Sequence, residues 1–152
     1  METTEAVKER LKALFASQGL AVLATCDGVS PYTSLMSVAV TDDLGSILFV
    51  TEEPSRKCSN IEKNPDVALL FDDRSKSGER DVAQGLAVTA LGKAARVPDD
   101  NRQWFLELFR SKHPHLESFA GSPTSVCFRV TVESWIVVSR FQNVVELSMK
   151  ES

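Results

Sequence analysis

Between residues 31 and 71 the chain contains, in order, PYTSLMSVAV (31–40), SILFVT (46–51), PSRK (54–57) and NPDVALLF (64–71). Three of these segments include apolar runs of strand length, rich in β-forming residues and bounded by Gly, Pro, Asn or Asp. PSRK opens a short helix that we expect over Pro54–Lys63, because Asn64-Pro65 ends it. The stretch therefore predicts strands at Pro31–Val40, Ser46–Thr51 and Val67–Phe71, with a helix before the last of them.

The residues before this stretch predict a helix and a further strand. Four apolar residues recur at helical spacing before a stop at Gly19: Val7, Leu11, Leu14 and Phe15. Leu20–Thr25 is then an apolar run closed by Asp27-Gly28, a dipeptide typical of hairpin turns. We therefore expect this strand to pair antiparallel with the strand that follows it.

The residues after Phe71 predict more strands, with helices between them. Polar residues at Asp72–Gln84 predict a mobile loop. The expected elements after it are a strand, an amphipathic helix, further helical turns and two strands: Leu86–Val97, Pro98 onward, His113–Ala120, Val126–Val138 and Asn143–Leu147. Gly92 within the first of these strands indicates a bulge or a close backbone approach.

The order of these elements predicts a mainly β protein with peripheral helices, of the α+β class. Hairpin-length connections dominate the first half of the chain, so most of the sheet is expected to be antiparallel. The strands are only partly separated by helices and the sequence has no Gly-rich dinucleotide loop, which excludes a doubly wound parallel fold. A small barrel is the natural way to close this many strands. We therefore predict one barrel domain over residues 1–152.

Composition and charge exclude several classes of function. The chain is 43% hydrophobic and 25% charged, and its net charge of −4 gives no general attraction to nucleic acid or anionic membranes. Cys26, Cys58 and Cys127 are odd in number and widely spaced, which argues against a disulfide framework or a zinc knuckle. No apolar run approaches the roughly 18 residues of a membrane span, and the acidic start of the chain differs from a signal peptide. We expect a cytoplasmic protein without a metal site.

The chemistry-bearing feature is a strand end that leads directly into a helix start. Thr51 closes the strand, and Ser55, Arg56 and Lys57 follow at the beginning of the helix. Free N–H groups and the helix dipole favour an anion at such a terminus, and the side chains add a hydroxyl and two cationic donors. The alternative is that Ser55 simply caps the helix and the two basic residues are solvated.

The order and spacing of these segments resemble the FMN-binding split-barrel family related to pyridoxamine 5'-phosphate oxidase. The similarity covers nearly the whole chain and includes the first helix, the first strand and the turn Gly28-Val-Ser-Pro31. It continues through Ser34–Val38, Phe49-Val-Thr51, Ser55-x-Lys57 and Asn64-Pro65, and more weakly through Leu86–Val97 and Trp135. The resemblance implies a largely antiparallel split β-barrel that holds FMN at the interface of a homodimer.

The resemblance also implies roles for particular residues. Those expected at the isoalloxazine ring are Leu35, Met36, Ser37 and Val38. Those expected beside the ribityl chain and phosphate are Val50, Thr51, Ser55, Arg56 and Lys57. Gln84 and Trp135 are weaker candidates that would reach across the subunit interface, and Trp135 fits the core of a strand equally well.

The expected function is that of an FMN-dependent oxidoreductase acting on a small molecule or a redox protein. Flavin itself transfers hydride and electrons, so no catalytic residue is assigned. Between Trp135 and Lys150 only Arg140 is basic, which disfavours oxidation of vitamin B6 phosphates. The alternative function is a non-catalytic protein that binds or senses FMN, deazaflavin or haem.

The histidines and cysteines are left without a fixed role. His113 and His115 lack nearby cysteine or carboxylate partners, so a surface or loop position is favoured over a metal pair. They are also the candidate axial ligands in the haem alternative. Cys26 and Cys58 have no His or Asp close in sequence that would indicate a nucleophile.

Overall fold

The computed structural model describes residues 2–73, 85–139 and 143–150. The helices are α1 (Thr4–Ser17), α2 (Arg56–Lys63), α3 (Arg102–Lys112) and α4 (Glu117–Ala120), with 3-10 turns η3 (Asp99–Asn101) and η4 (Pro114–Leu116). The strands are β1 (Leu20–Cys26), β2 (Pro31–Val40), β3 (Ser46–Glu52), β4 (Asp66–Asp72), β5 (Leu86–Arg96), β6 (Ser125–Ser139) and β7 (Asn143–Ser148). The predicted helices and strands are confirmed, with ends that differ by a residue or two. Most of the predicted loop after Asp72 lies outside the described residues.

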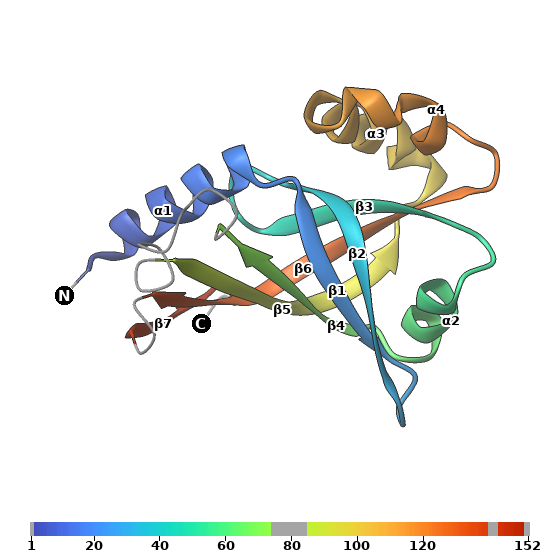
Figure 1. Ribbon diagram of the computed structural model, residues 1–152. Helices are drawn as coiled ribbons and strands as arrows, with labels where there is room; N and C mark the ends of the chain where they lie inside the picture. Colours follow the sequence, from blue (N-terminus) through green and yellow to red (C-terminus); the bar gives the residue numbers. More distant parts are fainter. Residues whose placement is uncertain (1, 74–84, 140–142, 151–152) are drawn as a thin grey trace.

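The strands form one antiparallel sheet that closes on itself (Figure 1). Neighbouring strands follow the order β3-β2-β1-β4-β5-β6-β7, and an additional pairing of β3 with β6 completes the barrel, leaving β7 outside it. Every ladder is antiparallel. The predicted fold class, a mainly β split barrel with peripheral helices, is confirmed.

Strand β6 organises the barrel because its length allows three partners. One edge pairs with β5, while the other pairs with β3 over its first half and with β7 over its second half. The register between β5 and β6 shifts between Leu91 and Gly92, where Glu133 of β6 is the extra residue, so the bulge lies opposite Gly92. A Cβ at Gly92 would lie 2.3 Å from the Thr131 carbonyl oxygen, so only glycine allows this approach.

The main core lies inside the barrel and beneath α1. The apolar face of α1 contributes its four predicted residues, Val7, Leu11, Leu14 and Phe15. The Phe15 ring packs against Phe71 and Trp135, with centroid separations of 4.8 and 5.0 Å. Trp135 is fully buried, and its indole Nε1–H donates to the Leu44 carbonyl oxygen at 2.9 Å. Burial and a satisfied polar atom together make this cluster a stabilising centre of the fold.

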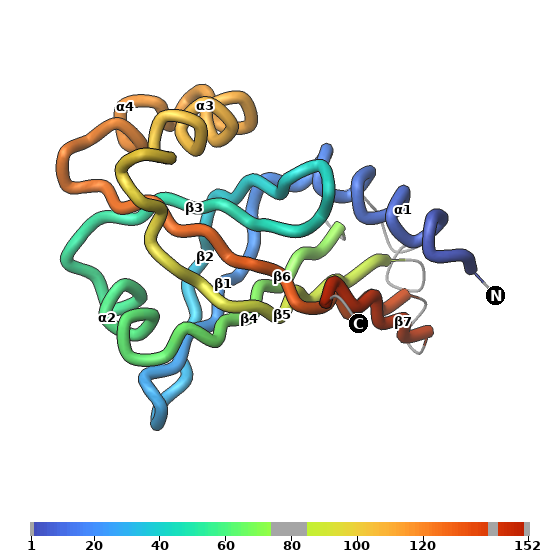
Figure 2. Tube along the Cα trace, turned by 180° about the vertical axis from the view of Figure 1, so that it is seen from behind, coloured from blue at the N-terminus to red at the C-terminus, as the bar shows by residue number. Residues whose placement is uncertain are grey.

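A second, smaller core holds α3 and α4 on the outside of the barrel. Figures 1 and 2 both show these helices above β3, at a distance from the start of α1. Their buried residues Phe105, Leu106, Phe109 and Ala120 pack with Ala39, Leu48, Val50 and Cys127 of the strands. The α3–α4 unit therefore covers the outer surface of the barrel beside β2 and β3.

The ladder between β2 and β3 is short. It contains the pairs Val40–Ile47, Ala39–Leu48 and Val38–Phe49. Beyond Val38, β2 stays paired with β1, while β3 continues alongside β6 as far as Glu52. The two strands therefore separate, and the barrel is split at this point.

A search of the described residues for membrane-spanning helices found none with the length and apolar character required to cross a bilayer.

Candidate functional site

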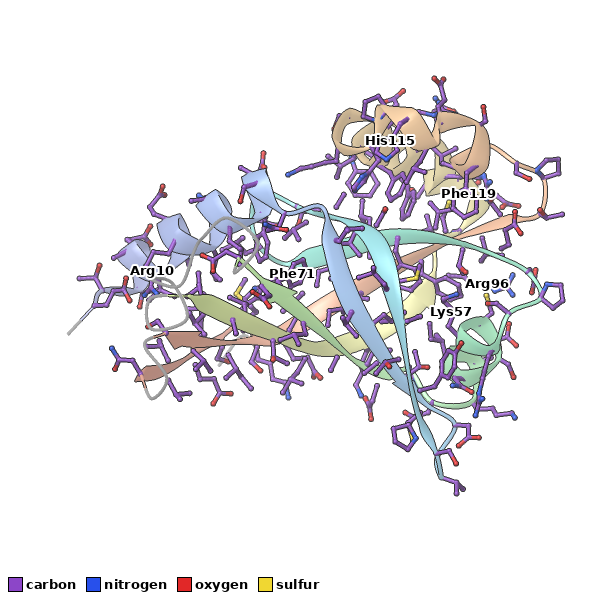
Figure 3. All side chains as sticks on the ribbon, in the orientation of Figure 1. Arg10, Lys57, Phe71, Arg96, His115 and Phe119 are labelled. Carbon is purple, nitrogen blue, oxygen red and sulfur yellow. The ribbon has the colours of Figure 1, made fainter. Side chains whose placement is uncertain are left out.

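A cavity of about 440 Å³ lies where β2 and β3 separate. Its lining residues come from both strands, from α2 and from the α3–α4 unit: Leu35, Met36, Ser37, Val50, Thr51, Lys57, Phe109, Leu116 and Phe119. Figure 3 shows Phe119 on the α4 side and Lys57 on the α2 side of this region. Its volume falls in the range of small-molecule and cofactor sites.

The structure brings six of the residues predicted for the cofactor into this one cavity: Leu35, Met36, Ser37, Val50, Thr51 and Lys57. Met36, Val50 and Thr51 are buried, whereas Leu35 is 67% exposed and faces outward. Val38 is buried where the β2–β3 ladder ends and does not belong to the lining.

The backbone of β2 presents polar groups to the open side of the cavity. The Val38 N–H donates to the Gly19 carbonyl oxygen, so the peptide groups of Val38 point toward β1. Because successive strand residues point these groups in opposite directions, those of Ser37 and Leu35 point away from β1. They face the side where β3 has diverged, so they can pair with the polar edge of a bound heterocycle.

The start of α2 supplies the features of an anion site. Ser55 is the N-cap residue, and its hydroxyl accepts a hydrogen bond from the Cys58 N–H at 3.2 Å. The first N–H groups of a helix have no partner within it, and the helix dipole adds positive potential there. Lys57 lines the cavity and forms no ion pair with any described residue. The buried Thr51 lies beside it in the lining and adds a hydroxyl group.

The structure places Ser55 and Arg56 outside the cavity lining. The Ser55 hydroxyl caps α2, as the alternative interpretation of the sequence expects. The Arg56 guanidinium stacks on the Tyr32 ring, 4.7 Å from its centroid. Of the three residues predicted for the phosphate clamp, the described cavity therefore contains Lys57 alone.

Of the two remaining candidates, one lies away from the cavity and the other cannot be placed relative to it. Trp135 has no exposed surface and packs in the barrel core, which is the second of the two positions considered for it. Gln84 lies outside the described residues. Trp135 is therefore a core residue rather than one that reaches out to a second subunit.

His113 anchors the α3–α4 side of the cavity to β2. The residue is buried, and its ring Nε2 lies 2.7 Å from the Val38 carbonyl oxygen. Because a carbonyl oxygen only accepts, Nε2 carries the hydrogen and donates. The ring also packs on the cavity residue Phe109 at 5.0 Å, and a Cβ at Gly19 would lie 2.8 Å from its Cε1. His113 therefore positions α3 against the strand that lines the cavity.

The apolar wall of the cavity was missed by sequence reasoning. Phe109, Leu116 and Phe119 lie far from β2 in the sequence, and no sequence pattern assigns them to the site. The amphipathic pattern from Pro98 predicts a buried helix face. It does not reveal which strand that face covers, because this depends on the His113–Val38 contact.

The cysteines lie apart from this chemistry. Cys26, Cys58 and Cys127 are all free thiols. Cys58 is buried behind the start of α2, with its Sγ 3.8 Å from the Glu52 carbonyl oxygen. Burial raises the pKa of the Cys127 thiol, which disfavours the nucleophilic thiolate. Among the described residues, no cluster of three or more His, Cys, Asp or Glu side chains could hold a metal ion.

Comparison with known families assigns the chain to a class that fits this geometry. The model of the pyridoxamine 5'-phosphate oxidase family matches residues 7–139, which is most of the chain. The protein therefore belongs to the pyridoxamine 5'-phosphate oxidase family, as its sequence pattern indicates. Comparison with curated proteins gave no match.

Solved structures share the fold at low sequence identity. A haem-binding protein from Mycobacterium smegmatis has a TM-score of 0.81 at 14% identity, over 97% of this chain and 59% of that one. A Clostridium acetobutylicum protein related to general stress protein 26, of the pyridoxinephosphate oxidase family, has a TM-score of 0.74 at 15% identity, over 97% of both chains. An FAD-binding protein from Mesorhizobium loti has a TM-score of 0.68 at 16% identity, over 85% and 91% of the chains. This chain thus spans about three fifths of the first relative's length.

Proposed function

We propose that this protein binds FMN in the cavity between β2 and β3 and acts as an oxidoreductase. The observation that supports this most strongly is the combination of Lys57, Thr51 and the start of α2 beside an apolar slot edged by strand backbone. A phosphate dianion requires a cation, hydroxyl and N–H donors, and a flavin ring requires an apolar slot with polar groups at its edge. The donor set of the cavity therefore fits FMN.

In this proposal each part of the lining has a task in binding. Lys57, Thr51 and the first N–H groups of α2 hold the phosphate. Ser37 and Leu35 offer backbone groups to the polar edge of the ring, and Phe109, Leu116 and Phe119 exclude water from its face. A bound flavin supplies hydride and electron transfer by its own chemistry, so the protein needs to bind and orient it. The substrate is a small molecule or a redox protein.

Haem is the second candidate cofactor, because one relative of similar fold is a haem-binding protein. The structure of this chain supports it less well than FMN. The Nε2 atom of His113 is engaged by the Val38 carbonyl oxygen and so is not free to ligate iron. His115 is exposed and lies outside the cavity between β2 and β3. Deazaflavin, which differs from flavin in the ring, is the third candidate for the same slot.

We also propose a homodimer formed through the outward face of β1, β2, β4 and β5. Its exposed leucines are Leu20, Leu35, Leu70 and Leu91. The ladders make them neighbours, since Val22 lies opposite both Leu35 and Leu70. Large exposed apolar patches are typical of interfaces, and a self-complementary pairing would cover this one. Leu35 lies both on this face and in the cavity lining, so the partner would border the cofactor.

FMN titration of the Lys57→Gln variant tests the proposed site. The loss of one charge-assisted hydrogen bond is expected to weaken FMN binding about 10- to 100-fold, measured by flavin fluorescence quenching. Lys63→Gln is the matched control, because it removes the same charge from the exposed last turn of the same helix. Equal affinity of both variants and the wild type would move the site elsewhere.

Two spectra separate the candidate functions. A Soret band in the protein as purified, with no retained FMN after reconstitution, would establish the haem alternative. If FMN is retained, bleaching of its visible absorption by NADH or NADPH supports the oxidoreductase. A retained flavin that neither nicotinamide donor nor dithionite-reduced redox protein can reduce would make the protein a non-catalytic binder.

The dimer is tested by a charge placed in the leucine face. Leu70→Lys is expected to give monomers in sedimentation at micromolar concentration and to reduce FMN retention, although Leu70 does not line the cavity. Val144→Lys is the control, because Val144 is 61% exposed on β7, outside this face. A wild-type protein that sediments as a monomer would reject the dimer.

A further inference from the structure

A second cavity of about 370 Å³ adjoins the first one. It lies between the C-terminal ends of α1 and α3, and its lining is Phe15, Ala16, Ser17, Gly19, Leu20, Ser37, Lys112, His113 and His115. Ser37 belongs to the lining of both cavities. Figure 3 shows His115 on the helical unit above β2, on the same side of the barrel as Phe119.

The polar part of this lining suits an organic anion. Lys112 is exposed at the end of α3 and forms no ion pair with any described residue. His115 is also exposed, and its ring stands edge-on to that of His113 at 5.9 Å. An ammonium group and an imidazole on the same rim are donors that a carboxylate accepts from. No carboxylate side chain belongs to the described lining, so this positive potential is not neutralised from within.

The rest of the lining suits an apolar ligand body. Phe15, Ala16 and Leu20 contribute hydrocarbon surface, and Leu20 is half exposed. The wall opposite them is rigid, because His113 is held by its hydrogen bond to Val38 and packed over Gly19. A rigid wall, an apolar surface and a cationic rim are the elements of a specific small-molecule pocket.

The position of the cavity connects it to the proposed flavin site. Ser37 separates the two spaces, and its neighbour Met36 lines the first. In the proposed function these β2 residues lie at the ring, whereas Lys57 and Thr51 lie at the phosphate. A ligand in the second cavity would therefore lie beside the ring part of the cofactor.

We propose that this second cavity is the substrate pocket, and that it takes a small organic carboxylate whose anionic end contacts Lys112 and His115. The role of the cavity as a substrate pocket rests on the proposed function, whereas the anion site is defined by the lining alone. Benzoate is a suitable probe, because it combines one carboxylate with a flat apolar body. Acetate is the matched comparison, since it keeps the charge and lacks that body.

The two histidines make the binding directly observable. His113 and His115 are the only histidines of the chain, so their ring signals in a ¹H–¹³C NMR spectrum form two sets. Assignment uses the His115→Gln variant. Benzoate titration is expected to shift the His115 ring signals saturably, and acetate is expected to bind at least about tenfold more weakly, because burial of a phenyl ring is worth more than one factor of ten. Absence of a saturable shift would overturn the proposal.

A charge variant locates the anionic end. Lys112→Gln is expected to weaken benzoate binding about tenfold, the effect of one charge-assisted contact. Lys12→Gln removes the same charge from the exposed side of α1, outside the cavity, and is expected to leave the affinity unchanged. Equal weakening by both variants would show a general charge effect and reject the assigned contact.

The same titration distinguishes this proposal from the flavin proposal. It is performed on the protein without cofactor and on the FMN-loaded protein. Saturable shifts of His115 without any FMN binding would uphold the anion site and reject the flavin site. With FMN bound, benzoate is expected to perturb the visible flavin spectrum. The dissociation constant from this perturbation is expected to equal the one from the His115 signals of the same FMN-loaded protein. An unperturbed spectrum at saturation would overturn the placement of the pocket beside the ring.

Discussion

The two ends of the β2–β3 hairpin serve opposite purposes. At the turn end, the Leu44 carbonyl oxygen accepts a hydrogen bond from the Trp135 indole of β6, and the strands are paired and buried. At the other end the ladder stops at Val38–Phe49, and the strands diverge around a cavity of about 440 Å³. The same two strands therefore contribute to the stable core at one end and leave polar groups available at the other.

This fold can accommodate a ligand where a ladder opens. Backbone groups inside a closed ladder are satisfied by their neighbours, so they have nothing to offer a cofactor. Opening the ladder after three pairs frees the outer edge of β2 while the inner edge stays fixed to β1. Functional sites commonly depart from the locally most stable arrangement, and the rest of the structure compensates.

The largest effect is expected at the closed end. Trp135→Ala removes a fully buried indole and leaves the Leu44 carbonyl oxygen without its donor. The free energy of unfolding is expected to fall by about 3–5 kcal/mol, measured by urea denaturation. Trp104→Ala is the control: this second tryptophan is 48% exposed on α3, and its loss is expected to cost less than about 1 kcal/mol.

The Trp135→Ala variant also tests the contrast between the two ends of the β2–β3 hairpin. Because Trp135 does not line the cavity, the FMN affinity of the folded fraction is expected to change less than about threefold. A much larger loss of FMN affinity at a temperature where the variant is folded would place Trp135 in the cofactor site after all. Similar destabilisation by both tryptophan variants would contradict the core assignment.

The sequence predicted the elements well because local chemistry marks their ends. Asp27-Gly28 and Asn64-Pro65 bound the strands by turn preference alone. Gly92 indicated the bulge because a strand interior rarely contains glycine without a close backbone approach, here to Thr131. The number and order of the strands predicted a barrel, and the family resemblance specified the split-barrel type.

The candidate site was predicted only in part, for physical reasons. Thr51 and Lys57 were identified because they stand near one strand–helix junction in the sequence, and Met36 was identified through the family resemblance. Phe119 was missed because α4 meets the cavity through tertiary packing. The orientation of Arg56 could not be predicted either, since it depends on the Tyr32 ring across the β1–β2 hairpin.

An intermediate effect is expected where α3 is attached to β2. The Cβ of Gly19→Ala would lie 2.8 Å from Cε1 of His113, a buried ring that is held by Val38. Displacing this ring is expected to cost about 1–3 kcal/mol of unfolding free energy, measured by urea denaturation. FMN affinity is also expected to fall severalfold, because Phe109 packs on the ring and lines the cavity.

A double-mutant cycle tests whether this contact is the cause. In a His113→Ala background the space beside Gly19 is open, so Gly19→Ala is expected to have nearly no further effect on stability. Additive losses in the double variant would show that Gly19 acts through something other than His113. The contrast between a fixed inner edge and a free outer edge of β2 would then lose its support.

The smallest effect is expected at the turn that closes the hairpin. The Asp43 carboxylate accepts hydrogen bonds from the Thr41 hydroxyl at 2.6 Å and the Gly45 N–H at 2.8 Å, and these bonds lower its pKa. A lowered pKa means that the stabilisation is complete above the ordinary Asp pKa of about 3.9 and is lost as the pH falls through the lower value of the folded state.

Because Asp43 is exposed, solvent screening keeps this contribution small. Asp43→Asn is expected to lower the free energy of unfolding by about 0.5 kcal/mol at pH 7, and the difference from wild type is expected to shrink as the pH falls below the ordinary Asp pKa of about 3.9. Asp42→Asn removes the same charge next to it, and Asp42 forms no side-chain hydrogen bond with the described residues. Urea denaturation at pH 7 and at a pH below about 3.9 measures the free energy of unfolding of the two variants and the wild type. A difference that grows as the pH falls would mean that Asp43 strains the turn, and the closed end would then owe its stability to Trp135 and the core alone.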